Sequence, residues 1–191
     1  MGNLKFRALH DCLGAEVRGL DLSVTLDAET KVALVEAWLK YQILLFRNQK
    51  LTAEEQREFC LQFGELGGRL RKAKDRPEGK DADNIMLVTN VRKDGVPIGS
   101  LPDGEMFFHH DKCYALEPDW GTMLYAIEVT KVGGHTRFAN MYKAWETLPE
   151  DLKQTIDGRR VLHIYKYLPT EKVNLKEDIS KYDHCWQPAV I

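Results

Sequence analysis

The sequence of 191 residues lacks any long apolar segment. Its apolar runs are short, as in Ile43 to Phe46, and fall far below the roughly 20 residues that cross a bilayer. The N-terminus also lacks the apolar stretch of a signal peptide, and Phe6 stands where the myristoylation pattern requires serine or threonine. We therefore expect a cytoplasmic protein that does not cross a membrane.

Cysteine is scarce, and no two cysteines form a C-x-x-C pair. This spacing excludes the common zinc-ribbon and redox-dithiol motifs. We expect reduced thiols, as is usual in the cytoplasm, at Cys12, Cys60, Cys113 and Cys185.

An excess of charge of one sign is also missing, because 27 basic residues oppose 29 acidic ones and give a net charge of −2. This balance argues against a nucleic-acid-binding surface. Apolar residues make up 43% of the chain, which is enough to form a core, and the length suits a single domain over residues 1–191.

Apolar spacing predicts two helices near the start of the chain, separated by a buried strand at residues 43–46. The first helix spans residues 25–41, with possible caps at Thr25 and Asp27. The second begins at the capping box Thr52 to Glu55 and ends near Gly64. The first helix is expected to bury an apolar face made of Val32, Val35, Trp38 and Leu39.

Residues 67–83 interleave basic and acidic side chains around Pro77 and Gly79, which is typical of an exposed loop. We interpret this loop as a lid over a site, in preference to a nucleic-acid patch, because it has no aromatic stacking residues. Its residues Arg69 and Arg71 are candidates for attracting an anionic substrate.

The rest of the chain is richer in strand signals and predicts an α+β fold or a β-barrel-like core. The expected turn is Lys93 to Gly95, and the expected helices are Met141 to Thr147 and Pro149 to Ile156. The expected strands are Ile85 to Thr89, Met106 to Phe108, Thr122 to Ile127 and Val161 to Tyr165.

The candidate chemistry lies in the run from Phe107 to Asp111. His109 and Asp111 are two residues apart on the expected strand, so their side chains leave the same face. Imidazole and carboxylate on one face are two of the three ligands of a non-haem iron facial triad. An H-x-D pattern alone also fits a solvated strand end. His110 points to the opposite face and is left out of the site.

Together, several runs resemble the taurine dioxygenase and 2,4-dichlorophenoxyacetate dioxygenase family. Phe108 to Asp111 falls where the family has its W-H-x-D iron motif, with Phe108 in place of tryptophan. The segment from Gly133 to Met141 resembles the family's G-G-x-T-x-F-A-N-M motif. By itself, its His135 is a metal ligand in principle, although a histidine in a Gly-Gly turn is more often solvated. The other matching runs are residues 14–22, 44–49 and 63–66.

This resemblance implies a double-stranded β-helix (jelly-roll) core with flanking helices, and dependence on Fe(II), 2-oxoglutarate and oxygen. The implied reaction hydroxylates a small, anionic organic substrate and releases succinate and CO2. By position, His109 and Asp111 correspond to iron ligands, and Thr136 corresponds to a residue that hydrogen-bonds 2-oxoglutarate. Phe108 would preserve an apolar wall beside the iron, and relatives often form dimers or tetramers.

The resemblance also implies a second histidine ligand and an arginine for 2-oxoglutarate, and neither has a counterpart before Ile191. His163 and His184 do not lie at the matching position. We therefore expect a part of a longer enzyme that lacks the last strands of the jelly roll. The alternative is a noncatalytic jelly-roll binding protein, since two protein ligands rarely hold iron without further support.

Overall fold

The computed structural model describes residues 4–67, 85–99, 107–115, 117–163 and 186–188. The chain divides into two units, Met1–Met106 and Phe107–Ile191. The described residues combine helices and short strands, as expected for an α+β protein. No helix in this described part of the chain has the length and apolar character needed to cross a membrane. The expected lid at residues 67–83 lies outside the described residues, except Gly67.

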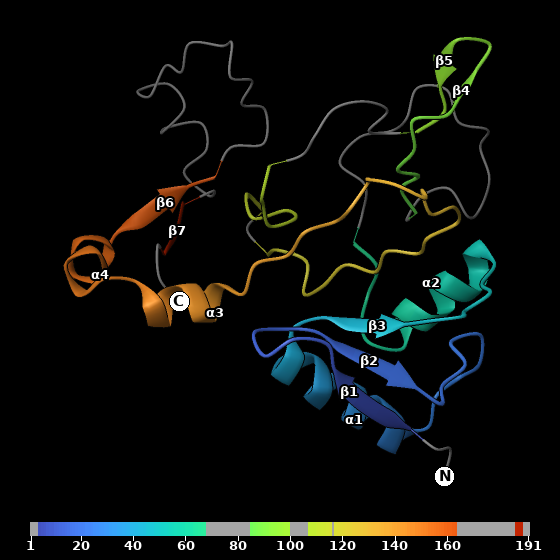
Figure 1. Cartoon of the computed structure of the whole chain (residues 1–191), viewed down its shortest axis with the longest axis horizontal. Coiled ribbons are helices and arrows are strands. Elements are labelled where there is room, and N and C mark those ends of the chain that lie inside the picture. Colours follow the sequence, from blue (N-terminus) through green and yellow to red (C-terminus); the bar gives the residue numbers. More distant parts are fainter. Residues whose placement is uncertain (1–3, 68–84, 100–106, 116, 164–185, 189–191) are drawn as a thin grey trace. The chain divides into compact units, whose positions relative to one another are not determined.

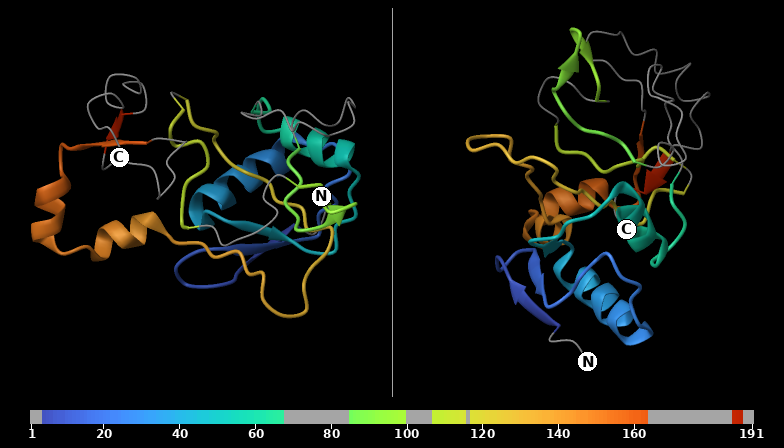
Figure 2. Two further views of the ribbon diagram at one scale, coloured as in Figure 1. Left: turned by 90° about the horizontal axis from the view of Figure 1, so that it is seen from above. Right: turned by 90° about the vertical axis from the view of Figure 1, so that its right-hand side faces the viewer.

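A small mixed sheet organises the first unit (Figure 1). Strand β1 (Lys5–Ala8) pairs antiparallel with β2 (Ala15–Arg18), which pairs parallel with β3 (Leu44–Phe46). A parallel neighbour requires a crossover, and helix α1 (Ala28–Tyr41) provides it. Figures 1 and 2 show α1 lying against one face of this sheet.

Of the two candidate caps of helix α1, Asp27 and not Thr25 is the N-cap, so the helix begins two residues later than the first candidate implies. The Asp27 carboxylate accepts a hydrogen bond of 2.7 Å from the backbone N–H of Thr30, which lowers the pKa of Asp27. The predicted apolar face is partly wrong, because Val32 and Leu39 are exposed. The buried residues are instead Leu34 and Ala37, whose spacing of three places them on one side of the helix.

Helix α2 (Ala53–Leu61) begins at the predicted capping box. The backbone N–H of Glu55 donates to the Thr52 hydroxyl, and the backbone N–H of Thr52 donates to the Glu55 carboxylate at 2.7 Å. Phe59 is buried and its ring lies 6.0 Å from that of Phe46 and 5.2 Å from that of Phe63. These aromatic contacts fix the helix to the end of β3.

Two glutamine side chains connect the long loop after β2 to the elements around it. Gln49 accepts a hydrogen bond from the backbone N–H of Leu22 and donates to the carbonyl of Leu20. Gln62 accepts from the backbone N–H of Leu26 at 2.7 Å. Leu22 and Leu26 are buried, so the glutamine amides satisfy backbone N–H groups that water cannot easily reach.

The remaining described elements are short. A hairpin joins β4 (Arg92–Lys93) to β5 (Val96–Pro97) through the predicted turn, where Asp94 and Gly95 have φ of 52° and 80°. Positive φ at both positions is the signature of a type I′ turn. The second unit contains α3 (Met141–Thr147), α4 (Glu150–Ile156), and β6 (Arg160–Leu162) paired antiparallel with β7 (Trp186–Pro188).

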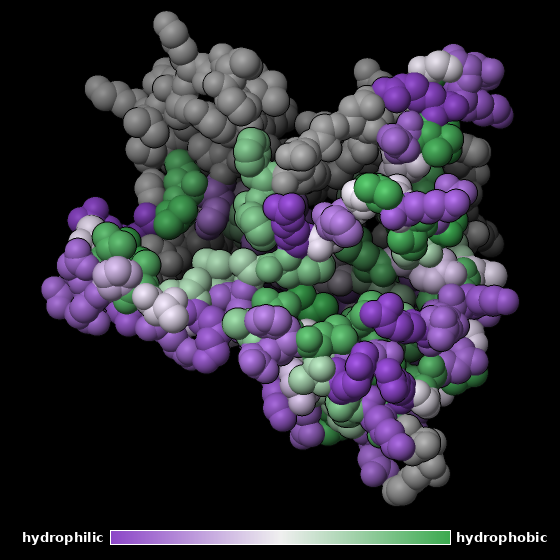
Figure 3. Space-filling view, in the orientation of Figure 1, coloured by the Kyte–Doolittle hydropathy of each residue, from purple (hydrophilic) through white to green (hydrophobic). Residues whose placement is uncertain are grey.

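Three predicted strands are wrong for their described residues. Residues 85–89, 107–108 and 122–127 form no strand, and Leu124 and Ile127 are exposed. A strand is made by hydrogen bonds to a neighbouring strand, and none of these segments has such a neighbour in the described part of the chain. Apolar side chains accordingly reach the surface in the space-filling view (Figure 3).

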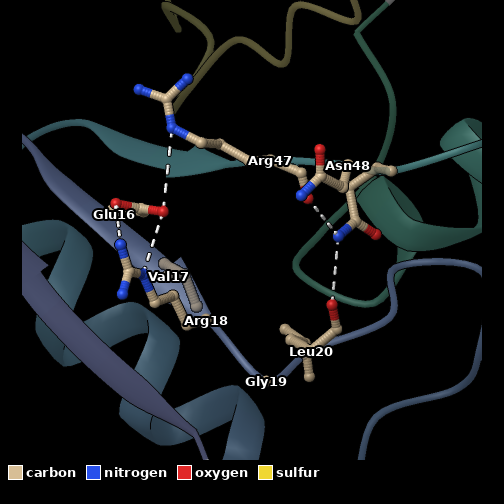
Figure 4. Close-up of a pocket in the computed structure, with 8 residues that line it drawn as sticks. Glu16, Val17, Arg18, Gly19, Leu20, Arg47 and Asn48 are labelled. Atoms are coloured by element: carbon tan, nitrogen blue, oxygen red, sulfur yellow. Dashed lines mark hydrogen bonds and ion pairs between the residues drawn. The ribbon is translucent and has the colours of Figure 1, made fainter.

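A buried carboxylate lies on the face of β2 opposite Ala15 and Val17. Glu16 is 5% exposed, and its carboxylate contacts three arginines, of which Arg7 lies at 2.6 Å, Arg18 at 3.0 Å and Arg47 at 3.7 Å. Figure 4 shows the Glu16 carboxylate between the Arg18 and Arg47 side chains, at the wall of a pocket of about 350 Å³.

Strand register explains why these charges meet. Arg7 is the direct cross-strand partner of Glu16, and Arg18 is two residues further along the same strand. Leu45 is the partner of Glu16 on β3, so Arg47 lies two residues beyond it on the same face. Hydrogen bonds from Arg18 and Arg7 lower the pKa of Glu16 to about 2.

We expect Glu16→Gln to lower the unfolding midpoint at pH 7, because it leaves three arginines around an uncharged amide. A carboxyl group with a lowered pKa stabilises the fold above its unfolded pKa of about 4.5 and loses that effect as the pH falls to about 2. The difference between wild type and Glu16→Gln should therefore shrink over this interval. Urea unfolding, followed by circular dichroism at pH values from 7 to 2, measures this difference in unfolding midpoint.

The control is Glu36→Gln, which removes an exposed carboxylate from α1 and is expected to leave the midpoint nearly unchanged. A difference between wild type and Glu16→Gln that stays constant from pH 7 to pH 2 would show that charge is not the stabilising feature of this cluster.

Candidate functional site

The second unit brings together the two side chains that the sequence predicts as metal ligands. Nε2 of His109 lies 3.2 Å from Oδ1 of Asp111. The strand expected here is absent, since residues 107–110 are irregular and Asp111 begins a turn. The two side chains converge all the same.

A backbone contact assigns the tautomer of His109. Its Nδ1 lies 2.7 Å from the carbonyl oxygen of Phe107, which can only accept a hydrogen bond, so Nδ1 carries the hydrogen. In the neutral imidazole, Nε2 then presents a lone pair to Oδ1 of Asp111, which is also an acceptor. Two acceptors that face each other require a proton or a cation between them.

The chemistry of these two donors fits a divalent transition-metal ion. A neutral imidazole nitrogen and a carboxylate oxygen are ligands of non-haem iron sites. A histidine ligand also commonly donates its second N–H to a carbonyl, as His109 does to Phe107. The residues present can therefore hold such an ion, with the donor atoms Nε2 of His109 and Oδ1 of Asp111.

The loop after Asp111 is held at two points. The Thr122 hydroxyl donates a hydrogen bond of 3.0 Å to Oδ2 of Asp111, the carboxylate oxygen that does not face His109. Lys112 adopts the left-handed conformation, with φ of 51°, and its ammonium group pairs with Asp119 at 2.7 Å. The carboxylate and the turn that carries it are thus fixed by separate contacts.

The site is open to solvent. The side chains of His109 and Asp111 are 47% and 52% exposed, so further ligands can reach a metal ion held between them. The neighbouring aromatic side chains of Phe107 and Phe108 are also exposed. The Phe108 side chain, expected to form an apolar wall beside the iron, is thus exposed to solvent.

The other predicted site residues are not assembled with this pair. Thr136 is exposed, and its hydroxyl makes no hydrogen bond to another described residue. His110 and His135 are exposed as well. Arg69 and Arg71 lie outside the described residues. Within the described ranges, no group of three histidine, cysteine, aspartate or glutamate side chains is placed to hold a metal ion.

The sequence does not predict the role of Thr122, whose hydroxyl contacts Oδ2 of Asp111. Eleven positions separate the two residues, and nothing in that spacing predicts the contact. The only signal in the sequence is weak: Thr122 is a hydroxyl residue at the start of the apolar segment Thr122 to Ile127, and that segment predicts a strand.

Comparison with known proteins gives one family. The model of the taurine catabolism dioxygenase TauD, TfdA family matches residues 5–190. A (S)-phenoxypropionate/alpha-ketoglutarate-dioxygenase of Sphingobium herbicidovorans is 34% identical over 154 residues, which cover 78% of this chain and 50% of the relative. The alpha-ketoglutarate-dependent 2,4-dichlorophenoxyacetate dioxygenase of Cupriavidus pinatubonensis is 29% identical over 164 residues, covering 81% of this chain and 56% of the relative.

A similar solved structure is that of a taurine dioxygenase from Burkholderia xenovorans. It is 25% identical, with a TM-score of 0.64, and the match covers 85% of this chain and 55% of that one. The chain thus spans about half the length of the curated relatives that it matches.

The facing acceptors generate a prediction for metal binding. Asp111→Asn should weaken Mn(II) binding at least about tenfold, because it removes the charged oxygen and keeps the shape of the side chain. Asp157→Asn at the end of α4 and His110→Ala should bind as wild type does. Titration of the free Mn(II) signal by electron paramagnetic resonance measures the affinity. Equal losses in Asp111→Asn and His110→Ala would show that the donors are wrongly assigned.

Proposed function

This chain belongs to the taurine catabolism dioxygenase TauD, TfdA family, and we propose that it serves the Fe(II)- and 2-oxoglutarate-dependent hydroxylation of a small anionic molecule. The family consists of enzymes that use Fe(II), 2-oxoglutarate and oxygen. The observation that carries the proposal is the pair of acceptors, Nε2 of His109 and Oδ1 of Asp111, at 3.2 Å.

His109 and Asp111 are the residues that would hold Fe(II). The hydrogen bond from Nδ1 of His109 to the Phe107 carbonyl orients the imidazole, so that Nε2 is directed toward Asp111. Bound Fe(II) supplies the redox chemistry that couples oxidation of 2-oxoglutarate, to succinate and CO2, with oxygen transfer to the substrate. One carboxylate and one neutral imidazole leave the ion a net positive charge, which favours an anionic chelator such as 2-oxoglutarate.

Thr136 is proposed to bind 2-oxoglutarate. Its hydroxyl is exposed and has no partner among the described residues, so it is available to donate a hydrogen bond to a carboxylate. Its position in the segment from Gly133 to Met141 matches the family motif. Phe108 is proposed to line the substrate side of the metal site, where its exposed ring excludes water from an apolar part of the substrate.

An anionic substrate is supported by the relatives. Their names include enzymes for phenoxypropionate, 2,4-dichlorophenoxyacetate and sulfonates, all of which carry an anionic group. In this chain we assign the attraction of such a group to Arg69 and Arg71, in a loop proposed as a lid. We also propose that the second unit contributes to a jelly-roll core, which is supported by the likeness to the taurine dioxygenase structure.

A noncatalytic binding protein is the second candidate. The observation that favours it is the number of donors, because the described residues place two side chains and not three around the metal position. In that case the chain would bind a metal ion or an anion without turnover.

An assay of succinate formation distinguishes these functions. With Fe(II), 2-oxoglutarate and a panel of aryloxyalkanoates and sulfonates, we expect the wild-type chain to release succinate and Asp111→Ala to release none. Thr136→Val should raise the KM for 2-oxoglutarate about tenfold, through loss of a charge-assisted hydrogen bond. Thr147→Val on α3 is the matched control and should leave that KM unchanged. Metal binding without any succinate would support the noncatalytic candidate and contradict the enzymatic one.

The lid arginines have a separate test. The double variant Arg69→Ala, Arg71→Ala should raise the KM for an anionic substrate about fivefold at low ionic strength, and the effect should shrink as salt screens the charges. The double variant Lys50→Ala, Lys131→Ala removes the same charge from exposed positions elsewhere and serves as control. An unchanged KM in the arginine variant across the salt series would refute the role of these residues.

A further inference from the structure

The hydroxyl of Thr122 donates a hydrogen bond to one of the two carboxylate oxygens of Asp111. Oδ2 of Asp111 accepts this hydrogen bond at 3.0 Å, while Oδ1 faces Nε2 of His109 at 3.2 Å. We propose that Thr122 is a positioning residue for the metal ligand: it holds the Asp111 carboxylate in one orientation, so that a single oxygen is presented to the metal ion. This inference rests on the proposed function.

A carboxylate needs such a constraint because its last torsion is soft. The two oxygens of aspartate are equivalent, and rotation about the final bond exchanges or tilts them at little cost. Threonine is well suited to prevent this, since its branched Cβ restricts the first torsion and directs the hydroxyl. A hydroxyl that donates to a charged carboxylate also makes a stronger hydrogen bond than one between neutral groups.

The contact is not a by-product of the turn, because the turn has its own support. Lys112 pairs with Asp119 at 2.7 Å, and the backbone N–H of Ala115 donates to the carbonyl of Lys112 at 2.8 Å. The Lys112 and Asp119 side chains are less exposed than those of the donor pair, at 21% and 32%. These contacts hold the backbone of the loop, and Thr122 adds a restraint on the carboxylate itself.

The restraint has a chemical consequence. A carboxylate that binds a metal ion through both oxygens takes two coordination positions, whereas one that binds through Oδ1 alone takes one. The hydrogen bond from Thr122 to Oδ2 favours the second mode for Asp111. A position is thereby left for exogenous ligands, which a site that binds a chelating cosubstrate and oxygen requires. Loss of the hydroxyl should alter both the affinity and the coordination of the metal.

The experiment compares Thr122→Ser with Thr122→Ala in the full chain. Both variants lack the methyl group, and they differ only in the hydroxyl. Mn(II) affinity, measured by electron paramagnetic resonance, should fall about tenfold in the alanine variant and stay within about twofold of wild type in the serine variant. Thr122→Val, which keeps the shape, should behave as alanine does. The visible spectrum of the Co(II)-loaded protein should change in the alanine and valine variants only.

Thr155→Val is the matched control, since it removes a hydroxyl that donates to a backbone carbonyl in α4. Thermal unfolding of each variant shows whether the fold is intact, and the comparison of serine with alanine remains decisive if valine is not accommodated. Equal affinity and equal spectra in the serine and alanine variants would overturn the inference while the proposed function stands. A wild-type chain that binds no Mn(II) or Co(II) would overturn both.

Discussion

Two lone-pair acceptors facing each other across 3.2 Å are the constraint on which the candidate site depends. Nε2 of His109 and Oδ1 of Asp111 repel each other unless a proton or a cation lies between them. Each side chain has a further contact: Nδ1 of His109 donates to the Phe107 carbonyl, and Oδ2 of Asp111 accepts from the Thr122 hydroxyl. We propose that these contacts orient the two side chains for a metal ion.

The first unit also contains a carboxylate that needs a positive partner, and here the protein itself provides it. Glu16 is buried on a strand, and burial of a carboxylate is unfavourable unless the charge is paired. Three arginines surround it, and they come from positions that the sheet register places on one face. In this unit the protein supplies every positive charge that the carboxylate needs, whereas the pair in the second unit meets at a position that a proton or a cation would occupy.

Local signals predicted the helices well and the strands poorly. The capping box at Thr52, the cap at Asp27 and the turn at Gly95 act within a few residues, so the sequence alone identifies them. Strands depend on partners that are distant in the sequence. Local patterns therefore do not predict β1 and β2, and they wrongly predict a strand at residues 122–127. The exposed Leu39 shows the same limit for a helix, because the position of the sheet decides which side of α1 is buried.

In the candidate site, too, contacts between residues near in the sequence are predictable and contacts between distant residues are not. The convergence of His109 and Asp111 follows from a spacing of two residues and was predicted, although the strand that motivated it is absent. The contact between Thr122 and Asp111 spans eleven residues and depends on the path of the intervening loop, so no local pattern indicates it. Motif resemblance, in contrast, identified the family from short runs spread over the chain, and the family match to residues 5–190 confirms it.

The most direct test of the account is the anomalous scattering of Mn(II) in crystals of this protein. We predict one strong peak between Nε2 of His109 and Oδ1 of Asp111, within bonding distance of both, with Oδ2 still bound by the Thr122 hydroxyl. A fully occupied Mn(II) peak elsewhere in the molecule, or none at this pair, would contradict the central claim that these two facing acceptors form a metal site.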